Sequence, residues 1–227
     1  MPLPSELLRE PRLICSIAAT WFRRRWRTIA LCQGLLLLLI WTALHPFDHP
    51  LLQAVRGSTL GLVPATALKL AEWLSKWGDF PGLNLVLALG LWLAGWAARK
   101  PRWRRLAVMT LLCAGMAGIA TNLIRCNLGR ARPYSKKADA FYGPHFTHEF
   151  QSCPSGHTTT AFAAAIPLLI AAPPLGIATT IAASGVAWSR MYLNRHYPAD
   201  IAMGLWMALW FGLPFGFAAR VRRVADG

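Results

Sequence analysis

Residues 158–189 read TTTAFAAAIPLLIAAPPLGIATTIAASGVAWS and contain no charged side chain. This stretch is too long for one straight membrane span and somewhat short for two, since a helix needs ~20 residues to cross ~30 Å of hydrocarbon. Pro173 and Pro174 interrupt it in the middle, where adjacent prolines disrupt a helix and suit a turn. We therefore predict a hairpin of two shortish helices. A single span would instead place the two ends of the stretch on opposite membrane faces.

Four further uncharged runs lie outside this hairpin, and each approaches the length of a membrane span. They cover residues 28–44, 80–98, 106–124 and 201–219. With the hairpin, they make six predicted spans in an all-α, polytopic membrane protein with a single domain over residues 1–227. More than twenty residues precede the basic flank of the first run, and no small-residue cleavage site follows it. We therefore expect an uncleaved anchor rather than a signal peptide.

The composition agrees with a membrane protein. Of the 227 residues, 55% are hydrophobic and 11 are tryptophan, and the mean hydropathy is +0.38. The net charge of +15 could indicate nucleic acid or anionic lipid, but most basic residues flank the apolar runs, so we predict no nucleic-acid partner. The five cysteines include no Cys-x-x-Cys pair and give no metal or redox signature.

The basic clusters predict the orientation in the membrane. With six spans, the clusters within residues 23–27, 99–105 and 220–223 all fall on one side. The positive-inside rule makes that side the cytoplasm. We therefore expect a bacterial-type cell membrane protein with a cytoplasmic segment at residues 1–27 and both termini inside. Residues 125–154 and 191–200 would then lie on the outer, periplasmic face.

An amphipathic pattern lies between the first two predicted spans. Leu70, Trp73, Leu74 and Trp77 recur at the i, i+3, i+4, i+7 spacing of one helix face. The pattern predicts a helix lying in the outer membrane interface. A helix packed on the bundle would show the same spacing, and the sequence leaves both interpretations open.

Two arginines stand at the outer end of the third span. Arg125 and Arg132 are seven residues apart, so both can face one side if the helix continues for two turns. Guanidinium groups bind phosphate oxygens in bidentate fashion and stay charged at any relevant pH. Anchoring to lipid headgroups would equally explain this cluster taken alone.

A second polar cluster, Pro154-Ser155-Gly156-His157, directly precedes an apolar helix. A helix start leaves free backbone N–H groups that favour an anion, and His157 would stand beside that anion as an acid. Taken alone, the cluster could also be a helix cap with an incidental histidine.

The third cluster contains Ser189-Arg190, then His196 and Asp200. Pro198 would occupy the first helical position of the last span, which places Asp200 in its first turn, where a carboxylate complements the helix dipole. A functional interpretation is that Asp200 accepts a hydrogen bond from one ring nitrogen of His196. The other nitrogen would then be unprotonated and nucleophilic.

Together the three clusters resemble the signature of the type 2 phosphatidic acid phosphatase family, which is Lys-x6-Arg-Pro, Pro-Ser-Gly-His and Ser-Arg-x5-His-x3-Asp. The second and third parts match in full, as does Arg132-Pro133. Arg125 stands where the family usually has lysine, which keeps the charge but replaces a compact ammonium by a planar fork. The family's six-helix membrane architecture accounts for the rest of the chain.

The resemblance implies a phosphoric monoester or diphosphate hydrolase that acts on lipids without metal or cofactor. His196 would attack phosphorus to form a phosphohistidine, Asp200 would orient it, and His157 would protonate the leaving oxygen and later activate water. The phosphate-binding groups would be Arg125, Arg132, Arg190, Ser155 and the backbone N–H of Gly156. The related vanadate-dependent haloperoxidases are soluble, so their activity is not expected here.

The sequence leaves the substrate open among undecaprenyl pyrophosphate, phosphatidylglycerophosphate, phosphatidic acid and lipid A phosphates. The loop of residues 134–152 would help to choose, through Lys136, Lys137, His145 and His148. A phosphotransferase using the same intermediate, and a non-catalytic lipid-phosphate binder or transporter, are the alternative functions. The bilayer and the lipid phosphate are the expected partners, with no obligate protein partner.

A disulfide is a separate hypothesis. Cys126 adjoins Arg125 and Cys153 adjoins Pro154, so both cysteines lie near motifs that must converge. An oxidising compartment would allow a Cys126–Cys153 bond that clamps the intervening loop, whereas two free thiols are the alternative.

Overall fold

The computed structural model describes residues 4–57, 65–135 and 137–225, and it is helical through most of that length. Eight α-helices follow one another along the described chain: α1 (Pro4–Leu39), α2 (Asp48–Arg56), α3 (Ala65–Trp77), α4 (Leu85–Ala97), α5 (Pro101–Leu128), α6 (Gly156–Ala171), α7 (Pro173–Tyr192) and α8 (Pro198–Ala225). Among the residues described, the only strand-like pairing is a single bridge between Arg130 and Phe141. The all-α prediction is confirmed.

Helix α6 lies at the centre of the bundle and packs against α5, α7 and α8. Its side chains are mostly small, and Ala161, Ala163, Ala164 and Ala165 are almost fully buried. Small residues let helix backbones approach closely, which is how helices pack in a membrane. On α8, Gly204 faces the start of α6, where an added Cβ would meet the Ser155 carbonyl oxygen at 2.8 Å.

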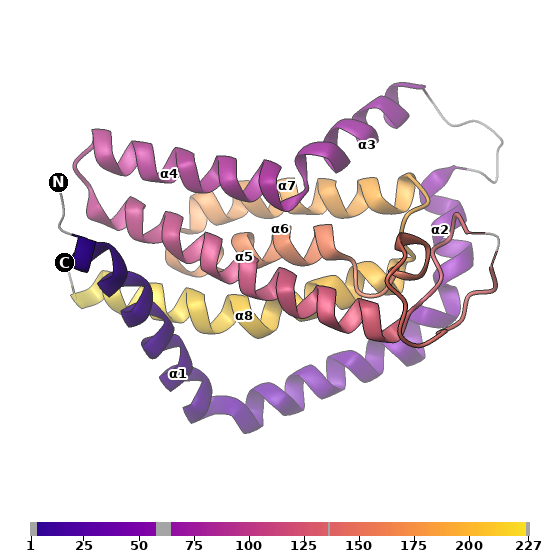
Figure 1. Ribbon diagram of the computed structural model, residues 1–227, viewed down its shortest axis with the longest axis horizontal. Helices are drawn as coiled ribbons and strands as arrows, with labels where there is room; N and C mark the ends of the chain where they lie inside the picture. The colour runs from indigo at the N-terminus through magenta and orange to yellow at the C-terminus, as the bar shows by residue number, and fades with distance from the viewer. Residues whose placement is uncertain (1–3, 58–64, 136, 226–227) are drawn as a thin grey trace.

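The predicted hairpin over residues 158–189 is confirmed. α6 ends at Ala171, and α7 begins at Pro173 after one non-helical residue. Pro173 stands at the start of α7, where a missing N–H costs nothing because the first-turn donors have no partner within the helix. The hairpin returns the chain, so the two ends of the stretch lie at the same end of the bundle (Figure 1).

Within the described residues, four helical segments are long and apolar enough to cross a membrane. They are Pro11–Arg56, Phe80–Ala97, Pro101–Leu128 and Pro198–Arg220, and each contains one of the predicted runs nearly in full. α6 is apolar but shorter, with 16 residues, and α7 has 20. The six-span count therefore stays a prediction that depends on the α6–α7 hairpin.

The first helical segment extends well beyond the predicted run of residues 28–44. It begins before the basic cluster and continues through a π-helical turn, Ile40–Leu44, and a 3-10 turn, His45–Phe47, into α2. Figure 1 shows α1 bending away from the bundle, with its first part against α8. Trp21 stacks on Phe217 with ring centroids 4.8 Å apart.

Helix α3 carries the predicted amphipathic pattern. Leu70, Trp73 and Trp77 are all exposed, whereas Ala71 is fully buried against the bundle. The helix packs on α7 and lies at the outside of the bundle (Figure 1). Packing on the bundle is therefore confirmed for one face of the helix, and placement of the exposed aromatic residues in the membrane interface stays a prediction.

The bundle has two distinct ends. Both termini and the α4–α5 turn lie at the left end in Figure 1, and the loop after α5 covers the right end together with α2. That loop begins at Gly129, whose φ of +62° ends α5 in the left-handed conformation and whose missing Cβ admits the Gly143 carbonyl. Backbone bonds from Tyr142 to Gly129 and from Gly143 to Leu128 then fold the loop back onto α5.

Candidate active site

The three sequence clusters meet at the right-hand end of the bundle in Figure 1. Four helix ends supply them, because α5 and α7 finish there while α6 and α8 begin there. Arg125 lies in the last turn of α5, Ser155 caps α6, and Arg190 lies in the last turn of α7. The short loop between α7 and α8 carries His196. The fold thus brings together residues up to 75 positions apart in the sequence.

His196 is held in one orientation. Its ring is 1% exposed, and its Nδ1 lies 2.7 Å from the backbone carbonyl oxygen of Ser152. A carbonyl oxygen can only accept, so Nδ1 must carry the proton and donate it to Ser152. Nε2 is therefore left with its lone pair, as a nucleophilic imidazole requires.

The environment keeps His196 neutral. Burial lowers its pKa from 6.5 to about 3, and the charges of Arg132 and Arg190 act in the same direction. The Asp200 carboxylate opposes this shift but does not cancel it. At physiological pH the ring is thus uncharged, with Nε2 available.

The prediction of a hydrogen bond between His196 and Asp200 is wrong, because the two side chains are too far apart in this structure. Asp200 Oδ2 lies 3.8 Å from His196 Nδ1, beyond hydrogen-bond distance. The carboxylate instead accepts from Arg130 Nη1 at 2.7 Å, from Ser152 Oγ at 2.5 Å and from the Tyr197 backbone N–H at 2.9 Å. These donors bond to both oxygens of the fully buried carboxylate, and the Ser152 carbonyl oxygen is the acceptor for His196 Nδ1.

Three arginines present unpaired donors at the site. Arg125, Arg132 and Arg190 each bury an Nε atom that has no hydrogen-bond partner among the described residues. Burial lowers the pKa of Arg132, and the neighbouring charges of Arg125 and Arg195 lower it further. Clustered guanidinium groups with unused N–H donors are a costly arrangement unless an anion completes it.

The start of α6 lies beside Arg125. Gly156 has no Cβ, and one added there would stand 3.0 Å from Arg125 Nη1. Ser155 is fully buried, and its Oγ accepts a hydrogen bond from Thr158 at 3.0 Å, which leaves its own proton free to donate. The Ser155 backbone N–H is already bonded to the Asp200 carbonyl at 3.0 Å, so its hydroxyl is the group that can reach an anion.

The end of α3 supplies two residues that the sequence clusters did not indicate. Ser75 Oγ accepts a hydrogen bond from Arg190 Nη1. Asp79 Oδ1 lies 3.8 Å from His157 Nε2, and the same oxygen caps the Phe80 backbone N–H at 2.8 Å. The only sequence signal for Asp79 was its position before Phe80-Pro81, which reads as an ordinary helix cap.

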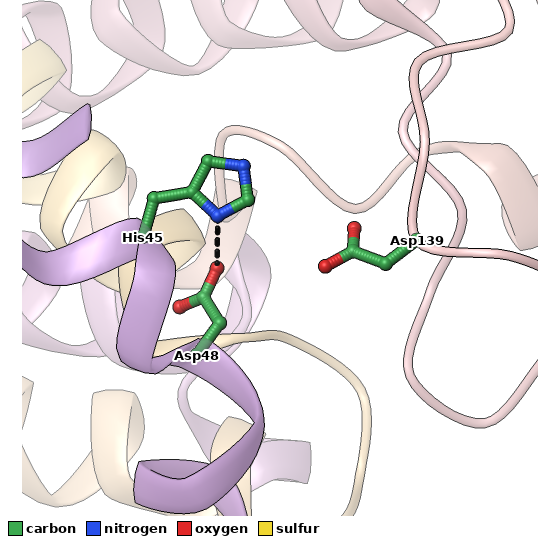
Figure 2. Close-up of side chains that lie close together, drawn as sticks. All are labelled: His45, Asp48 and Asp139. Carbon is green, nitrogen blue, oxygen red and sulfur yellow. Dashed lines mark ion pairs between the residues drawn. The ribbon is translucent and has the colours of Figure 1, made fainter. Parts of the chain in front are cut away.

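A His–Asp–Asp group lies beside the site, at the junction of α1 and α2. Figure 2 shows His45 and Asp48 near one another, with Asp139 facing them from the loop across a gap. Their ligand atoms lie within 4.8 Å of one another, which could suit a metal ion. However, Arg130 Nη2 donates to both carboxylates at 2.8 Å, so a fixed cation already pairs with the two aspartates. This group therefore fits an ion-pair network better than a metal centre.

The structure does not support the hypothesis of a disulfide bond between Cys126 and Cys153. Cys126 and Cys153 are both free thiols in the structure. Cys153 is fully buried in an apolar cluster with Ile40, Ala199 and Met203, and this burial raises the pKa of its thiol well above the ordinary value. Cys126 instead accepts a hydrogen bond from the Gln151 side chain at 3.4 Å.

The loop residues named for substrate choice are mostly at the surface. Lys137 and His148 are exposed, and His145 is half-buried against Phe150 with ring centroids 4.4 Å apart. Lys136 lies outside the described residues. Their part in substrate choice stays a prediction.

Comparison with known proteins agrees with this site. The profile of the PAP2 superfamily matches residues 85–221, which include every residue of the three clusters. A lipid A 1-phosphatase from Rhizobium johnstonii is 30% identical over 165 residues, covering 66% of this chain and 67% of its own length. A lipid A 1-phosphatase from Rhizobium etli is also 30% identical, with 66% and 70% covered.

A solved structure has the same fold. It is the crystal structure of a transmembrane PAP2-type phosphatidylglycerolphosphate phosphatase from Bacillus subtilis, with a TM-score of 0.57 and 18% sequence identity. The superposition covers 87% of this chain and 96% of that one. The chain belongs to the PAP2 superfamily and is a membrane-associated lipid phosphatase.

Proposed function

We propose that the protein hydrolyses a lipid phosphate or pyrophosphate without metal, through a phosphohistidine on His196 Nε2. The observation that carries the proposal is a neutral, oriented histidine beside three arginines whose buried Nε atoms have no hydrogen-bond partner among the described residues. Fixed positive charge of this kind stabilises the equatorial oxygens of a phosphoryl group in the transition state.

In the first step, the Nε2 lone pair of His196 attacks phosphorus and the bond from phosphorus to the leaving oxygen breaks. His157 gives its proton to that oxygen, and the lipid product leaves. In the second step, His157 takes a proton from water, the water oxygen attacks phosphorus, and the P–N bond breaks. Inorganic phosphate then leaves, and the Nε2 lone pair is restored.

The imidazole becomes positively charged while phosphorus is bound to it. The Nδ1 proton then makes a stronger hydrogen bond to the Ser152 carbonyl, 2.7 Å away. The Asp200 carboxylate, 3.8 Å away, stabilises the same charge through space. In this proposal Asp200 acts on His196 electrostatically and through Ser152.

We place the active site on the periplasmic face of a bacterial cell membrane, with six spans and both termini in the cytoplasm. The clustered basic residues support this orientation. The position of the site at the end of the bundle away from both termini supports it too.

Lipid A carrying a 1-phosphate is the substrate that we would test first, because the matched relatives carry the name lipid A 1-phosphatase. Phosphatidylglycerophosphate, phosphatidic acid and undecaprenyl pyrophosphate are the other candidates. Transfer of the phosphoryl group to another lipid is the second candidate reaction, since it differs only in which acceptor reaches the phosphohistidine.

The test is phosphate release by the detergent-purified protein over these four lipids, in excess EDTA. His196→Ala removes the nucleophile, and Lys100→Ala, an exposed residue at the opposite end of the bundle, is the matched control. We expect EDTA-resistant release by the wild type and the control, and loss of release in His196→Ala. An alkali-stable, acid-labile label from a 32P-labelled lipid should appear on the wild type and on Lys100→Ala, and it should be missing from His196→Ala.

Release that survives in folded His196→Ala would overturn the phosphohistidine. Release that depends on an added lipid acceptor would favour the phosphotransferase. Binding of the lipids without phosphate release or labelling of the protein would favour the non-catalytic lipid-phosphate binder.

A further inference from the structure

Arg130 is the largest fully buried side chain among the described residues. It is 0% exposed and donates to three carboxylates from three different segments. Nη1 bonds to Asp200 at 2.7 Å, Nη2 to Asp48 at 2.8 Å, and Nε and Nη2 form a fork on Asp139 at 2.8 Å each. Burial alone would lower the pKa of Arg130, but the three carboxylates hold that pKa above its ordinary value.

This network reaches the nucleophile through Ser152. The Arg130 carbonyl accepts from the Ser152 backbone N–H at 3.1 Å. Asp200, which Arg130 holds by its side chain, accepts from Ser152 Oγ at 2.5 Å. The Ser152 carbonyl is in turn the acceptor for His196 Nδ1. Ser152 is thus held by Arg130 along two routes, and it decides which way the His196 ring faces.

The same network fixes the start of α8. Asp48 is 1% exposed, and its Oδ1 accepts from the Ala199 backbone N–H at 2.7 Å while its Oδ2 accepts from Arg130. The Arg130 guanidinium also lies over the Tyr197 ring, 4.3 Å from its centroid. The segment that follows His196 is therefore held near Arg130 in two ways. Asp48 joins the Ala199 backbone to the guanidinium, and the Tyr197 ring packs against it.

We propose that Arg130 is a positioning residue for the reaction, which aims His196 Nε2 at phosphorus by holding Ser152 and Asp200 in place. The proposal rests on the phosphohistidine function above. We assign Arg130 no contact with the phosphate, because its Nε, Nη1 and Nη2 atoms all donate to carboxylates, whereas the Nε atoms of the three site arginines have no partner among the described residues.

Lysine cannot replace the guanidinium here. Three carboxylates are bridged by a planar fork, whereas an ammonium is a compact charge that cannot span the same positions. Arg130→Lys should therefore keep the positive charge but release Ser152 or Asp200. A displacement of about 1 Å at a reacting group can cost roughly 100-fold in rate.

The experiment compares Arg130→Lys and Asp139→Asn with Glu149→Gln, a matched control on the same loop. Among the described residues, the Glu149 side chain forms no hydrogen bond or ion pair with the network. The measurements are kcat and KM for phosphate release, the inhibition constant of orthovanadate, and the thermal midpoint in detergent. Orthovanadate can adopt the five-coordinate geometry of phosphoryl transfer, so its binding reports how well Nε2 is aimed.

We expect Arg130→Lys to lower kcat roughly 100-fold, with KM within about threefold, and to weaken orthovanadate inhibition by a similar factor. Asp139→Asn should show the same pattern to a smaller extent, roughly tenfold, because Arg130 keeps Asp48 and Asp200. Glu149→Gln should match the wild type. If Arg130→Lys does not fold, the kcat and orthovanadate inhibition of Asp139→Asn test the proposal.

A purely structural role predicts a different result. A partly unfolded population lowers the apparent kcat and the thermal midpoint, but the remaining folded enzyme binds orthovanadate as tightly as the wild type does. That outcome, or wild-type kcat in both variants, would overturn the proposal. Failure of the underlying function is distinguishable, because folded His196→Ala would then release phosphate normally whatever the Arg130 variants do.

Discussion

The chemistry of the site depends on which atom of His196 carries the proton. The Ser152 carbonyl assigns it to Nδ1, and burial keeps the ring neutral. The motif spacing predicted His196 as the nucleophile but assigned its orientation to Asp200. In the structure, the backbone carbonyl of Ser152 orients the ring, and no pattern of side chains in the sequence can indicate a backbone acceptor. Asp200 instead accepts a hydrogen bond from Arg130.

At the residue scale, the low pKa of His196 makes stability depend on pH. With a folded pKa of about 3 and an ordinary value of 6.5, the unfolded chain binds more protons between these pH values. Stability from this residue should therefore fall as the pH drops below 6.5, by about 2 kcal/mol between pH 7 and pH 5. His196→Asn keeps a donor for the Ser152 carbonyl but does not titrate.

The thermal midpoint in detergent measures this difference. Between pH 7 and pH 5 the wild type should lose more stability than His196→Asn does. Parallel pH curves for the two proteins would contradict a neutral, buried His196.

Gly156 offers a second residue-scale prediction. A Cβ at this position would stand 3.0 Å from Arg125 Nη1, so the guanidinium must give by a few tenths of an ångström. Gly156→Ala should therefore lower kcat/KM roughly tenfold while the thermal midpoint hardly changes, because positioning errors cost far more in rate than in stability. Gly90→Ala, where an added Cβ meets nothing within 4 Å, is the control. Equal kcat/KM in both variants would show that Arg125 does not need this space.

At the scale of helices, the close packing of α6 against α8 brings together the loop that precedes α6 and the loop between α7 and α8. The prolines of the hairpin were readable in the sequence, and the helix ends follow them within a residue or two. The packing of α6 against α8 could not be predicted from the sequence, because the apolar helices of this chain have similar compositions and none of them indicates its neighbour. Gly204, which permits the contact, has no local signal of its own.

Gly204→Ala should therefore destabilise the bundle. The added methyl group would lie 2.8 Å from the Ser155 carbonyl oxygen and 3.0 Å from Thr158 Cβ, and overpacking of this kind costs roughly 1–3 kcal/mol. The control is Gly34→Ala, where nothing lies within 4 Å. A lower thermal midpoint in Gly204→Ala alone is the expected result, and equal midpoints would argue against tight α6–α8 packing.

At the scale of the whole molecule, the termini and the site lie at opposite ends of the bundle (Figure 1), which supports the proposed orientation. A Lys137→Cys variant without the native cysteines should react with a membrane-impermeant maleimide in intact spheroplasts, because Lys137 is exposed on the loop at the site. A fluorescent protein fused to the C-terminus should mature in the cytoplasm. Labelling of Lys137→Cys only after cell lysis would reverse the proposed orientation.

The sequence by itself determined the class of the protein and predicted the residues to which we assign its chemistry. Apolar runs, prolines and basic flanks report on each segment locally, and the Arg125–Arg132, Ser155–His157 and Arg190–Asp200 motifs carry their own spacing. Only the tertiary structure decided how those residues are held. Arg130, Asp48 and Asp139 look like ordinary surface charges in the sequence, and they become a buried network because the loop after α5 folds back over the end of the bundle. Contacts between segments so far apart depend on the packing of helices, which no local pattern encodes.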